Sequence, residues 1–288
     1  MATDGFAVFI LTHGRANRVV TYKTLRRQGY TGAIWIIIDN EDDQQAEYCK
    51  RFGKQVIVFD KRAEAARLDA GDNFDDRRAV VYARNASFQI ARDLGLRYFL
   101  QLDDDYDRFL YKFDASLRYK ERPVKNLDKL FAILLRYYVG IPALTLAMAQ
   151  NGDFIGGERG TRALKVGLFR KAMNTFFCAV HRPFQFVGRV NEDVNTYVES
   201  GRIGKLFLTT NQVAIMQART QQKPGGMTGM YMEEGTYRKS FYPILYAPSC
   251  VRIALMGYRD RRLHHKVLWN NAVPCIIRDS YGPTHSSD

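Results

Sequence analysis

The 288-residue sequence predicts an α/β fold built on an open, mostly parallel sheet flanked by helices. Three observations lead to this fold class. Short apolar runs alternate with segments of helical periodicity through the N-terminal third of the chain. The runs are continuous, which is typical of strands buried on both faces of a parallel sheet. Each run also ends abruptly in polar residues, as strands do where an open α/β sheet gathers its ligands.

The N-terminal elements are expected in the order strand, helix, strand, helix, strand. The three strands are predicted at residues 6–11, 34–38 and 55–59. The helices between them are predicted over residues 16–28 and 42–52. Gly29 fits the C-terminal stop of the first helix, and residues 61–76 form a polar insertion. Right-handed crossovers between such units give a Rossmann-like wound sheet.

The stretch that organises the chain is a strand at residues 97–102, which follows a helix expected over 78–94. Four carboxylates come directly after it, from Asp103, Asp104, Asp105 and Asp107. Unpaired carboxylates this close together repel one another and are costly to bury, which favours a cation among them. Oxygen ligands suit Mg²⁺ or Mn²⁺, and Mg²⁺ is commonly held by one or two carboxylates and substrate phosphates. A helix cap or a solvated turn is the alternative interpretation.

Composition limits the class of protein. Hydrophobic residues make up 46% of the chain, so it is not mainly disordered, and the cysteines are spaced as free thiols would be. No apolar run approaches the roughly 18 residues of a membrane span, and the N-terminus lacks a signal-peptide layout, so we expect a cytoplasmic protein. The net charge of +13 favours a polyanionic partner, nucleic acid ahead of an anionic membrane, over a basic surface that only aids solubility.

The first turn contains neither a GxGxxG motif nor a P-loop. This absence argues against a dinucleotide oxidoreductase or a P-loop kinase, and it leaves other nucleotide sites open. Asp39, at the end of the second strand, is either a helix cap or an acceptor of hydrogen bonds from a base or ribose.

Several short motifs resemble those of the type A glycosyltransferases. They are residues 12–15, Asp39, the Arg84–Asn85 pair and residues 102–105. The resemblance implies the type A fold, with a DxD motif whose carboxylates hold Mn²⁺ or Mg²⁺ against the diphosphate of a nucleotide-sugar donor, expected to be UDP-linked. Asp103 and Asp105 are then the metal ligands, with the register of the three aspartates open. The implied donor contacts in this half come from Thr12, His13, Gly14, Arg15, Asp39, Arg84, Asp103 and Asp104.

Residues 189–193 are similar to the motif in which an inverting enzyme of this fold keeps its catalytic base. An acceptor hydroxyl has a pKa far above neutrality, so its attack requires a positioned carboxylate. Asp193 and Glu192 are the candidates, although acids at a helix start are also ordinary caps. We expect an inverting single displacement, because a base is present and no distinct nucleophile is.

The C-terminal third contains motifs that point to a narrower group of enzymes. Residues 223–231, 235–241, 248–249 and 263–266 resemble the phage glycosyltransferases associated with TET/JBP proteins, which modify hydroxymethylpyrimidines in DNA. This resemblance implies an acceptor in double-stranded phage DNA, 5-hydroxymethylcytosine first, and action in the host cytoplasm. Lys223, Gly225 and Gly226 would close over the donor phosphates, unless their loop is a plain connector. One histidine of the pair His264 and His265 would complete the metal shell.

We expect a single domain in three parts, with a nucleotide-sugar half at 1–107, an acceptor half at 108–218 and a loop with C-terminal extension at 219–288. Stacking and phosphate contacts hold a base that leaves the duplex. The candidates for acceptor or DNA contacts are Arg118, Lys120, Arg122, Arg182, Phe184, Arg261 and Arg262. The alternatives are a lipid, polysaccharide or protein acceptor, and a non-catalytic nucleic-acid-binding module on a transferase scaffold.

Overall fold

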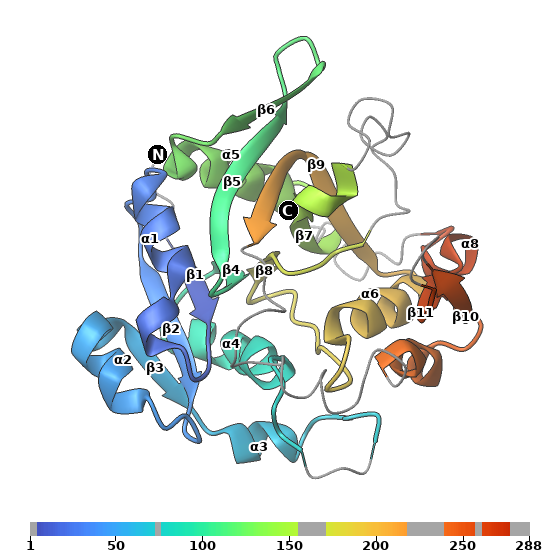
Figure 1. Ribbon diagram of the computed structural model, residues 1–288, viewed down its shortest axis with the longest axis horizontal. Coiled ribbons are helices and arrows are strands. Elements are labelled where there is room, and N and C mark those ends of the chain that lie inside the picture. The colour runs from blue at the N-terminus through green and yellow to red at the C-terminus, as the bar shows by residue number, and fades with distance from the viewer. Residues whose placement is uncertain (1–4, 73–75, 155–170, 218–238, 257–260, 277–288) are drawn as a thin grey trace, which may run out of the picture.

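The structure is a computed structural model of the chain, and it describes residues 5–72, 76–154, 171–217, 239–256 and 261–276. Within these ranges one large sheet runs through the molecule, and helices cover both of its faces (Figure 1). The sheet has nine strands in the order β3-β2-β1-β4-β8-β7-β9-β5-β6, and β10 and β11 form a separate ribbon. The predicted α/β fold with an open, mostly parallel sheet is confirmed.

The bounds of the elements follow in chain order. The strands are β1 (Phe6–Leu11), β2 (Ile34–Asp39), β3 (Val56–Phe59), β4 (Tyr98–Asp103), β5 (Tyr106–Phe113), β6 (Tyr119–Pro123), β7 (Ala143–Gln150), β8 (Phe176–Ala179), β9 (Leu206–Gln217), β10 (Val251–Met256) and β11 (Arg262–Val267). The helices are α1 (Val20–Arg27), α2 (Gln45–Phe52), α3 (Lys61–Ala65), α4 (Val81–Asp93), α5 (Leu127–Val139), α6 (Glu192–Arg202) and α8 (Trp269–Ala272). Short 3-10 turns are η1 (Ala16–Arg18), η2 (Gly53–Gln55) and η3 (Asn151–Phe154).

The direction of the strands brings the polar strand ends together. β1 is a parallel neighbour of both β2 and β4, and β3 continues the parallel set beyond β2. β7 and β9 are also parallel neighbours, whereas β8 and β5 run against the other strands. Because β1, β2 and β4 all end at one edge of the sheet, the loops after them meet there.

The continuous apolar runs are explained by two apolar layers, one on each face of the sheet. Along β1, the side chains of Phe6, Val8 and Ile10 enter the layer beneath α1 and α5. The intervening residues Ala7, Phe9 and Leu11 enter the layer beneath α4 and α6. Successive strand residues point to opposite faces, so a strand covered on both sides must be apolar throughout.

Two predicted helix starts and the polar insertion differ from the structure. Residues 16–18 form η1, so the first helix begins only at Val20, and the second begins at Gln45. The Asp42 carboxylate accepts hydrogen bonds from the backbone N–H groups of Gly14 and Gln44. These bonds keep Asp42 outside the second helix. The insertion contains α3, because the Asp60 carboxylate caps it by accepting the backbone N–H of Ala63.

The four cysteines are free, as predicted, although only Cys178 and Cys250 are buried. None of the helices in the described ranges combines the length and hydropathy that crossing a bilayer requires.

Candidate active site

The candidate site lies at the edge of the sheet where β1, β2 and β4 end, and α6 begins beside it. The three aspartates after β4 occupy three different environments. Asp104 is buried, and its two oxygens accept hydrogen bonds from Thr12 Oγ1 at 2.6 Å and Arg15 Nη1 at 3.0 Å. Burial raises the pKa of Asp104, and Arg15 acts against that rise. Asp104 therefore supports the loop after β1, and its predicted contact with the donor stays a prediction.

Asp103 and Asp105, which flank Asp104 in the sequence, differ from it in their contacts. Asp103 Oδ1 accepts a hydrogen bond from Arg84 Nη2 at 3.0 Å, and its side chain is 24% exposed. Asp105 contacts Gln217, the last residue of β9, at 3.5 Å. Burial, and then repulsion from Asp103 and Asp104, raises the pKa of Asp105 to about 7. An acid whose charge is disfavoured in this way marks a place where a cation would be stabilised.

The chain alone does not complete a metal shell in the part that the structure describes. No group of three His, Cys, Asp or Glu side chains there lies close enough to hold a metal ion. His264 and His265, which were predicted to include a metal ligand, lie on β11 and belong to no such group. Two carboxylates without a third ligand suit Mg²⁺ or Mn²⁺ only if a substrate supplies further oxygens.

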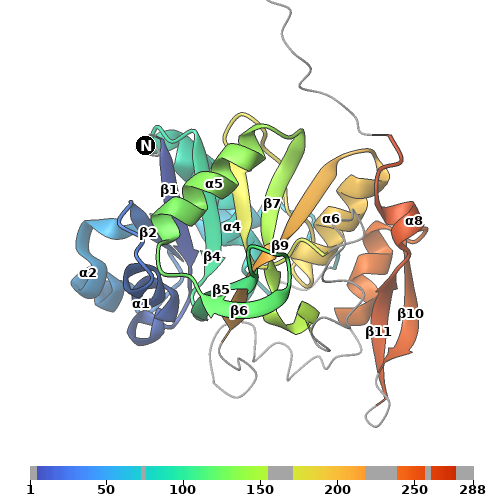
Figure 2. The same ribbon diagram turned by 90° about the horizontal axis from the view of Figure 1, so that it is seen from above.

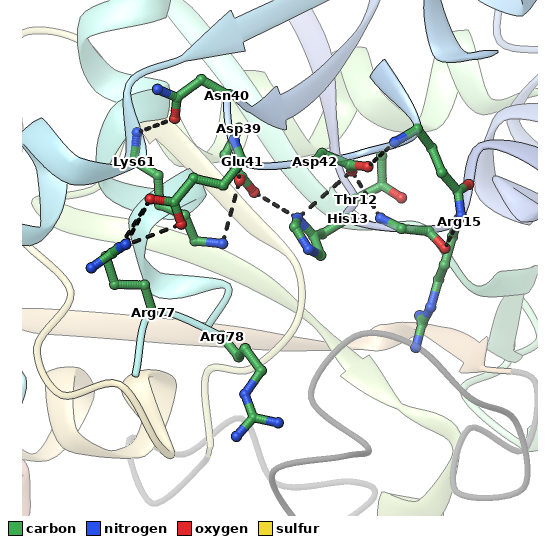
Figure 3. A network of polar contacts seen from close by, with 12 residues as sticks. Thr12, His13, Arg15, Asp39, Asn40, Glu41, Asp42, Lys61, Arg77 and Arg78 are labelled. Atoms are coloured by element: carbon green, nitrogen blue, oxygen red, sulfur yellow. Dashed lines mark hydrogen bonds and ion pairs between the residues drawn. The ribbon is translucent and has the colours of Figure 1, made fainter. Parts of the chain in front are cut away.

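The ends of β1 and β2 carry a second polar network (Figure 3). His13 Nδ1 lies 2.8 Å from Asp39 Oδ2, and Lys61 Nζ lies 3.3 Å from Asp39 Oδ1. Burial opposes the charge on Asp39, but His13 and Lys61 outweigh it and hold the pKa of Asp39 below its usual value. The same hydrogen bond raises the pKa of His13, whose side chain is 40% exposed. Asp39 therefore orients His13 and anchors Lys61.

Arg84 connects the acidic strand end with the start of α6. It projects from α4, donates through Nε to Glu192 Oε1 at 2.9 Å, and bonds Asp103 through Nη2. Its guanidinium lies 5.0 Å from the ring centroid of Phe176 and 5.7 Å from that of Phe186. Burial opposes its charge, yet Asp103 and Glu192 together raise the pKa of Arg84, so it remains a cation.

Asp193 lies next to Glu192 and has different partners. Its side chain is buried and accepts a hydrogen bond from the backbone N–H of Val194 at 2.7 Å. Burial, and then repulsion from Glu192, raises the pKa of Asp193 to about 7. A carboxylate that titrates near neutrality is suited to accept a proton at that pH, whereas Glu192 is held by Arg84.

A second buried arginine fixes the segment before α6. Arg189 Nε donates to Asp72 Oδ2 at 2.6 Å, and Tyr242 OH donates to the same oxygen. The backbone N–H groups of Gly188 and Arg189 donate to the carbonyls of Asp69 and Ala70. Residues of the polar insertion thereby hold the start of α6 in place.

Two predicted acceptor residues pack against the interior, Arg182 fully buried and Phe184 partly buried. The Arg182 guanidinium donates to the carbonyls of Ile141, Ala143 and Tyr138, which satisfies these backbone acceptors and leaves the side chain buried. Phe184 packs edge-on against Phe88 and Phe207. Arg182 is therefore placed to stabilise the fold and not to contact DNA, whereas Phe184 is only partly buried and its predicted contact with the acceptor stays a prediction.

The other predicted acceptor residues are exposed. Arg118, Lys120 and Arg122 lie on or beside β6, in the hairpin with β5, and Arg261 and Arg262 lie at the start of β11. The predicted loop residues Lys223, Gly225 and Gly226 lie outside the described residues.

Sequence reasoning missed three contributors to the site. Tyr48 OH contacts Thr12 Oγ1 and accepts the backbone N–H of Arg15. Lys61 and Gln217 contact Asp39 and Asp105. A signal existed only for Lys61, because it lies two residues beyond the end of a parallel strand at the same edge. Tyr48 projects from a helix face, and Gln217 ends a strand whose place in the sheet was not predicted.

Comparisons with known proteins come from a family model and from solved structures. The family model described as TET-Associated Glycosyltransferase matches residues 6–226. No curated protein matches the chain.

The solved structures are distant in sequence. TarS from S. aureus, residues 1–349, shares 10% identity with a TM-score of 0.44, over 75% of this chain and 61% of its own. A cytidylyltransferase from Leptospira borgpetersenii shares 13% identity with a TM-score of 0.31, over 62% of this chain and 61% of its own. Glucosyl-3-phosphoglycerate synthase from Mycobacterium tuberculosis, in complex with Mg²⁺ and UDP, shares 10% identity with a TM-score of 0.44, over 91% of this chain and 87% of its own. The chain thus spans 61% of the length of the first two structures.

The buried position of Arg84 predicts a large stability loss on its removal. Arg84→Met leaves Asp103 and Glu192 without their shared cation, so we expect the free energy of unfolding to fall by about 3 kcal/mol. Urea unfolding measures the change. Arg92→Met, on the exposed side of the same helix, is the control and should change stability by less than about 0.5 kcal/mol. Equal stability of the two variants would show that Arg84 does not hold the site together.

Proposed function

This chain belongs to the TET-associated glycosyltransferase family, and from that premise we propose that it transfers a sugar from a UDP-linked donor to a hydroxymethylated pyrimidine in duplex DNA. The preferred acceptor is 5-hydroxymethylcytosine in phage DNA. The observation that carries the proposal is that one buried arginine, Arg84, pairs with acids from two distant parts of the chain. Arg84 pairs with Asp103 on one side and with Glu192 on the other, which supports a site where the proposed metal-binding strand end and the proposed base lie close together.

The donor end of the site is assigned to Asp103 and Asp105. These residues fit a hard divalent ion, because both are carboxylates and the pKa of Asp105 is raised first by burial and then by repulsion from Asp103 and Asp104. A bound Mg²⁺ or Mn²⁺ would offset the negative charge that develops on the leaving diphosphate. His13 and Arg15, held by Asp39 and Asp104, lie in the loop after β1 and are the proposed side-chain contacts to the donor.

The base is assigned to Asp193. Its carboxylate accepts the proton of the hydroxymethyl oxygen while that oxygen bonds to the anomeric carbon, and the bond from that carbon to the diphosphate breaks. Glu192 acts as a positioning residue, because Arg84 bonds its carboxylate and fixes the first turn of α6. A single displacement of this kind inverts the anomeric configuration.

The choice of DNA as acceptor rests on charge. The chain carries a net charge of +13, and the predicted contacts Arg118, Lys120 and Arg122 are exposed. They belong to the hairpin of β5 and β6, whose ribbon is labelled in Figure 1. Exposed arginine and lysine side chains bind the phosphate backbone without regard to sequence. A neutral oligosaccharide acceptor would make no use of these cations.

Transfer to modified DNA is the direct test. Nucleotide sugars are incubated with Mn²⁺ and duplexes that contain cytosine, 5-hydroxymethylcytosine or 5-hydroxymethyluracil, and nucleosides are then analysed by mass spectrometry. We expect a hexose or pentose adduct only on a hydroxymethylated base. No adduct should form in EDTA, because binding of the donor requires the metal ion. Transfer to a lipid, glycan or protein in place of DNA would contradict the acceptor, and full activity in EDTA or in Asp105→Ala would contradict the metal assignment.

The raised pKa of Asp193 predicts the pH dependence. Below about pH 7 the carboxyl is protonated and cannot accept the hydroxyl proton, so kcat/KM should fall about tenfold for each further pH unit. Asp193→Asn should lower kcat at least about a hundredfold with donor affinity unchanged, since the amide keeps the shape without the basicity. Glu199→Gln, an acid-to-amide change on the same helix, is the control. Near-normal turnover by Asp193→Asn would assign the base elsewhere.

A further inference from the structure

The ribbon of β10 and β11 is separate from the main sheet and stands beside α6 (Figure 2). A two-stranded ribbon has little stability of its own, so its base must be anchored. Val251 is buried and Val267 packs on the core layer beneath α4 and α6. The backbone N–H of Leu268 donates to the carbonyl of Cys250 at 2.7 Å. One end of the ribbon is therefore fixed, and the other extends away from the core.

The register of the ribbon collects cations on one face. Residues directly opposite each other in an antiparallel pair lie on the same face, and alternate positions along a strand share it. Arg252 is opposite Lys266, and Met256 is opposite Arg262. The three basic side chains are exposed. We name this surface, formed by Arg252, Arg262 and Lys266, the basic face of the ribbon.

Two large apolar side chains are exposed at the outer end of the ribbon. Leu255 is 63% exposed and Met256 is 46% exposed at the end of β10. Because successive strand residues point to opposite faces, Met256 lies on the basic face, opposite Arg262, and Leu255 lies on the other face, opposite Leu263. Arg261 and Arg262 lie close to them, at the start of β11. The outer end of the ribbon therefore exposes an apolar side chain on each face, and Met256 lies among the cations of the basic face.

This outer end is linked to the residues around the proposed base. Ser240 Oγ donates to the carbonyl of Leu263, the residue opposite Leu255, at 3.1 Å. The neighbouring Lys239 carbonyl accepts from Asn191 Nδ2 at 2.5 Å. Asn191 immediately precedes α6, whose first two residues are Glu192 and Asp193. Two hydrogen bonds therefore connect the apolar end of the ribbon with the turn that carries Asp193.

We propose that the β10–β11 ribbon enters the major groove of the acceptor duplex and holds the target base at Asp193. The inference rests on the proposed function and names the element that recognises its acceptor. The major groove admits a two-stranded ribbon, and it is the groove into which a substituent on pyrimidine C5 projects. The basic face contacts phosphates along the groove, while at the inserted outer end Met256 from that face and Leu255 from the opposite face contact the apolar edges of the bases next to the hydroxymethyl group.

Two pairs of substitutions separate the phosphate contacts from the apolar ones. Arg252→Gln with Lys266→Gln removes cations that bind phosphates, so the log-log dependence of duplex affinity on salt should become shallower by about 0.9 for each phosphate that is no longer neutralised. Leu255→Ser with Met256→Ser should leave that slope unchanged and raise the KM for hydroxymethylated duplex at least about tenfold, with kcat for the bound duplex unchanged. Fluorescence anisotropy with unmodified duplex gives the salt slope, and nucleoside mass spectrometry gives transfer.

The controls are Arg136→Gln and Ile133→Ser, which remove side chains of the same kinds from exposed positions on α5, away from the ribbon (Figure 2). Thermal unfolding and calorimetric donor binding show whether each variant is intact. Ribbon variants that match these controls in both assays would overturn the inference. If the wild-type protein modifies no DNA, the proposed function fails, and the salt slopes on unmodified duplex still test the ribbon separately.

Discussion

The structure depends on one buried cation that has acids on two sides. Arg84 is 2% exposed at its side chain, and it can remain charged there only because Asp103 and Glu192 both pair with it. Removing a guanidinium from water costs several kcal/mol, so the pairs must form if the helix is to pack. The end of β4, the middle of α4 and the start of α6 therefore have to meet at one point. Asp103 and Glu192, which are distant in the sequence, are brought together for this reason.

The surroundings of α6 repeat the same arrangement at a second arginine. Arg189 pairs with Asp72 and with Asp76, and both acids come from the segment between α3 and α4. The same segment reaches the loop after β2, where Arg77 pairs with Glu41 at 2.9 Å (Figure 3). The segment between α3 and α4 thus connects the loop after β2 with the start of α6. Part of the polarity of this segment is explained by these ion pairs.

The parts of the fold and site that sequence could predict are those set by local patterns. The continuous apolar runs located β1 to β4, and the acid cluster after residue 102 pointed to the candidate site, because a strand and its end are specified by a few consecutive residues. Side-chain direction could not be read in that way. Asp104 turns inward to Thr12 and Arg15, and Arg182 turns inward to backbone carbonyls, although both resemble exposed charges in the sequence. The place of β5 and β8, which run against the other strands, depends on contacts between distant segments.

A double-mutant cycle between the two ends that Arg84 joins measures their coupling most directly. Asp103→Asn and Glu192→Gln are made singly and together, in the wild-type chain and in Arg84→Met, and the free energy of unfolding is measured for each. We expect a coupling energy of about 1 kcal/mol or more in the wild-type chain, and its loss when Arg84 is absent. Effects that add within about 0.5 kcal/mol in both backgrounds would show that the donor end and the base end are independent.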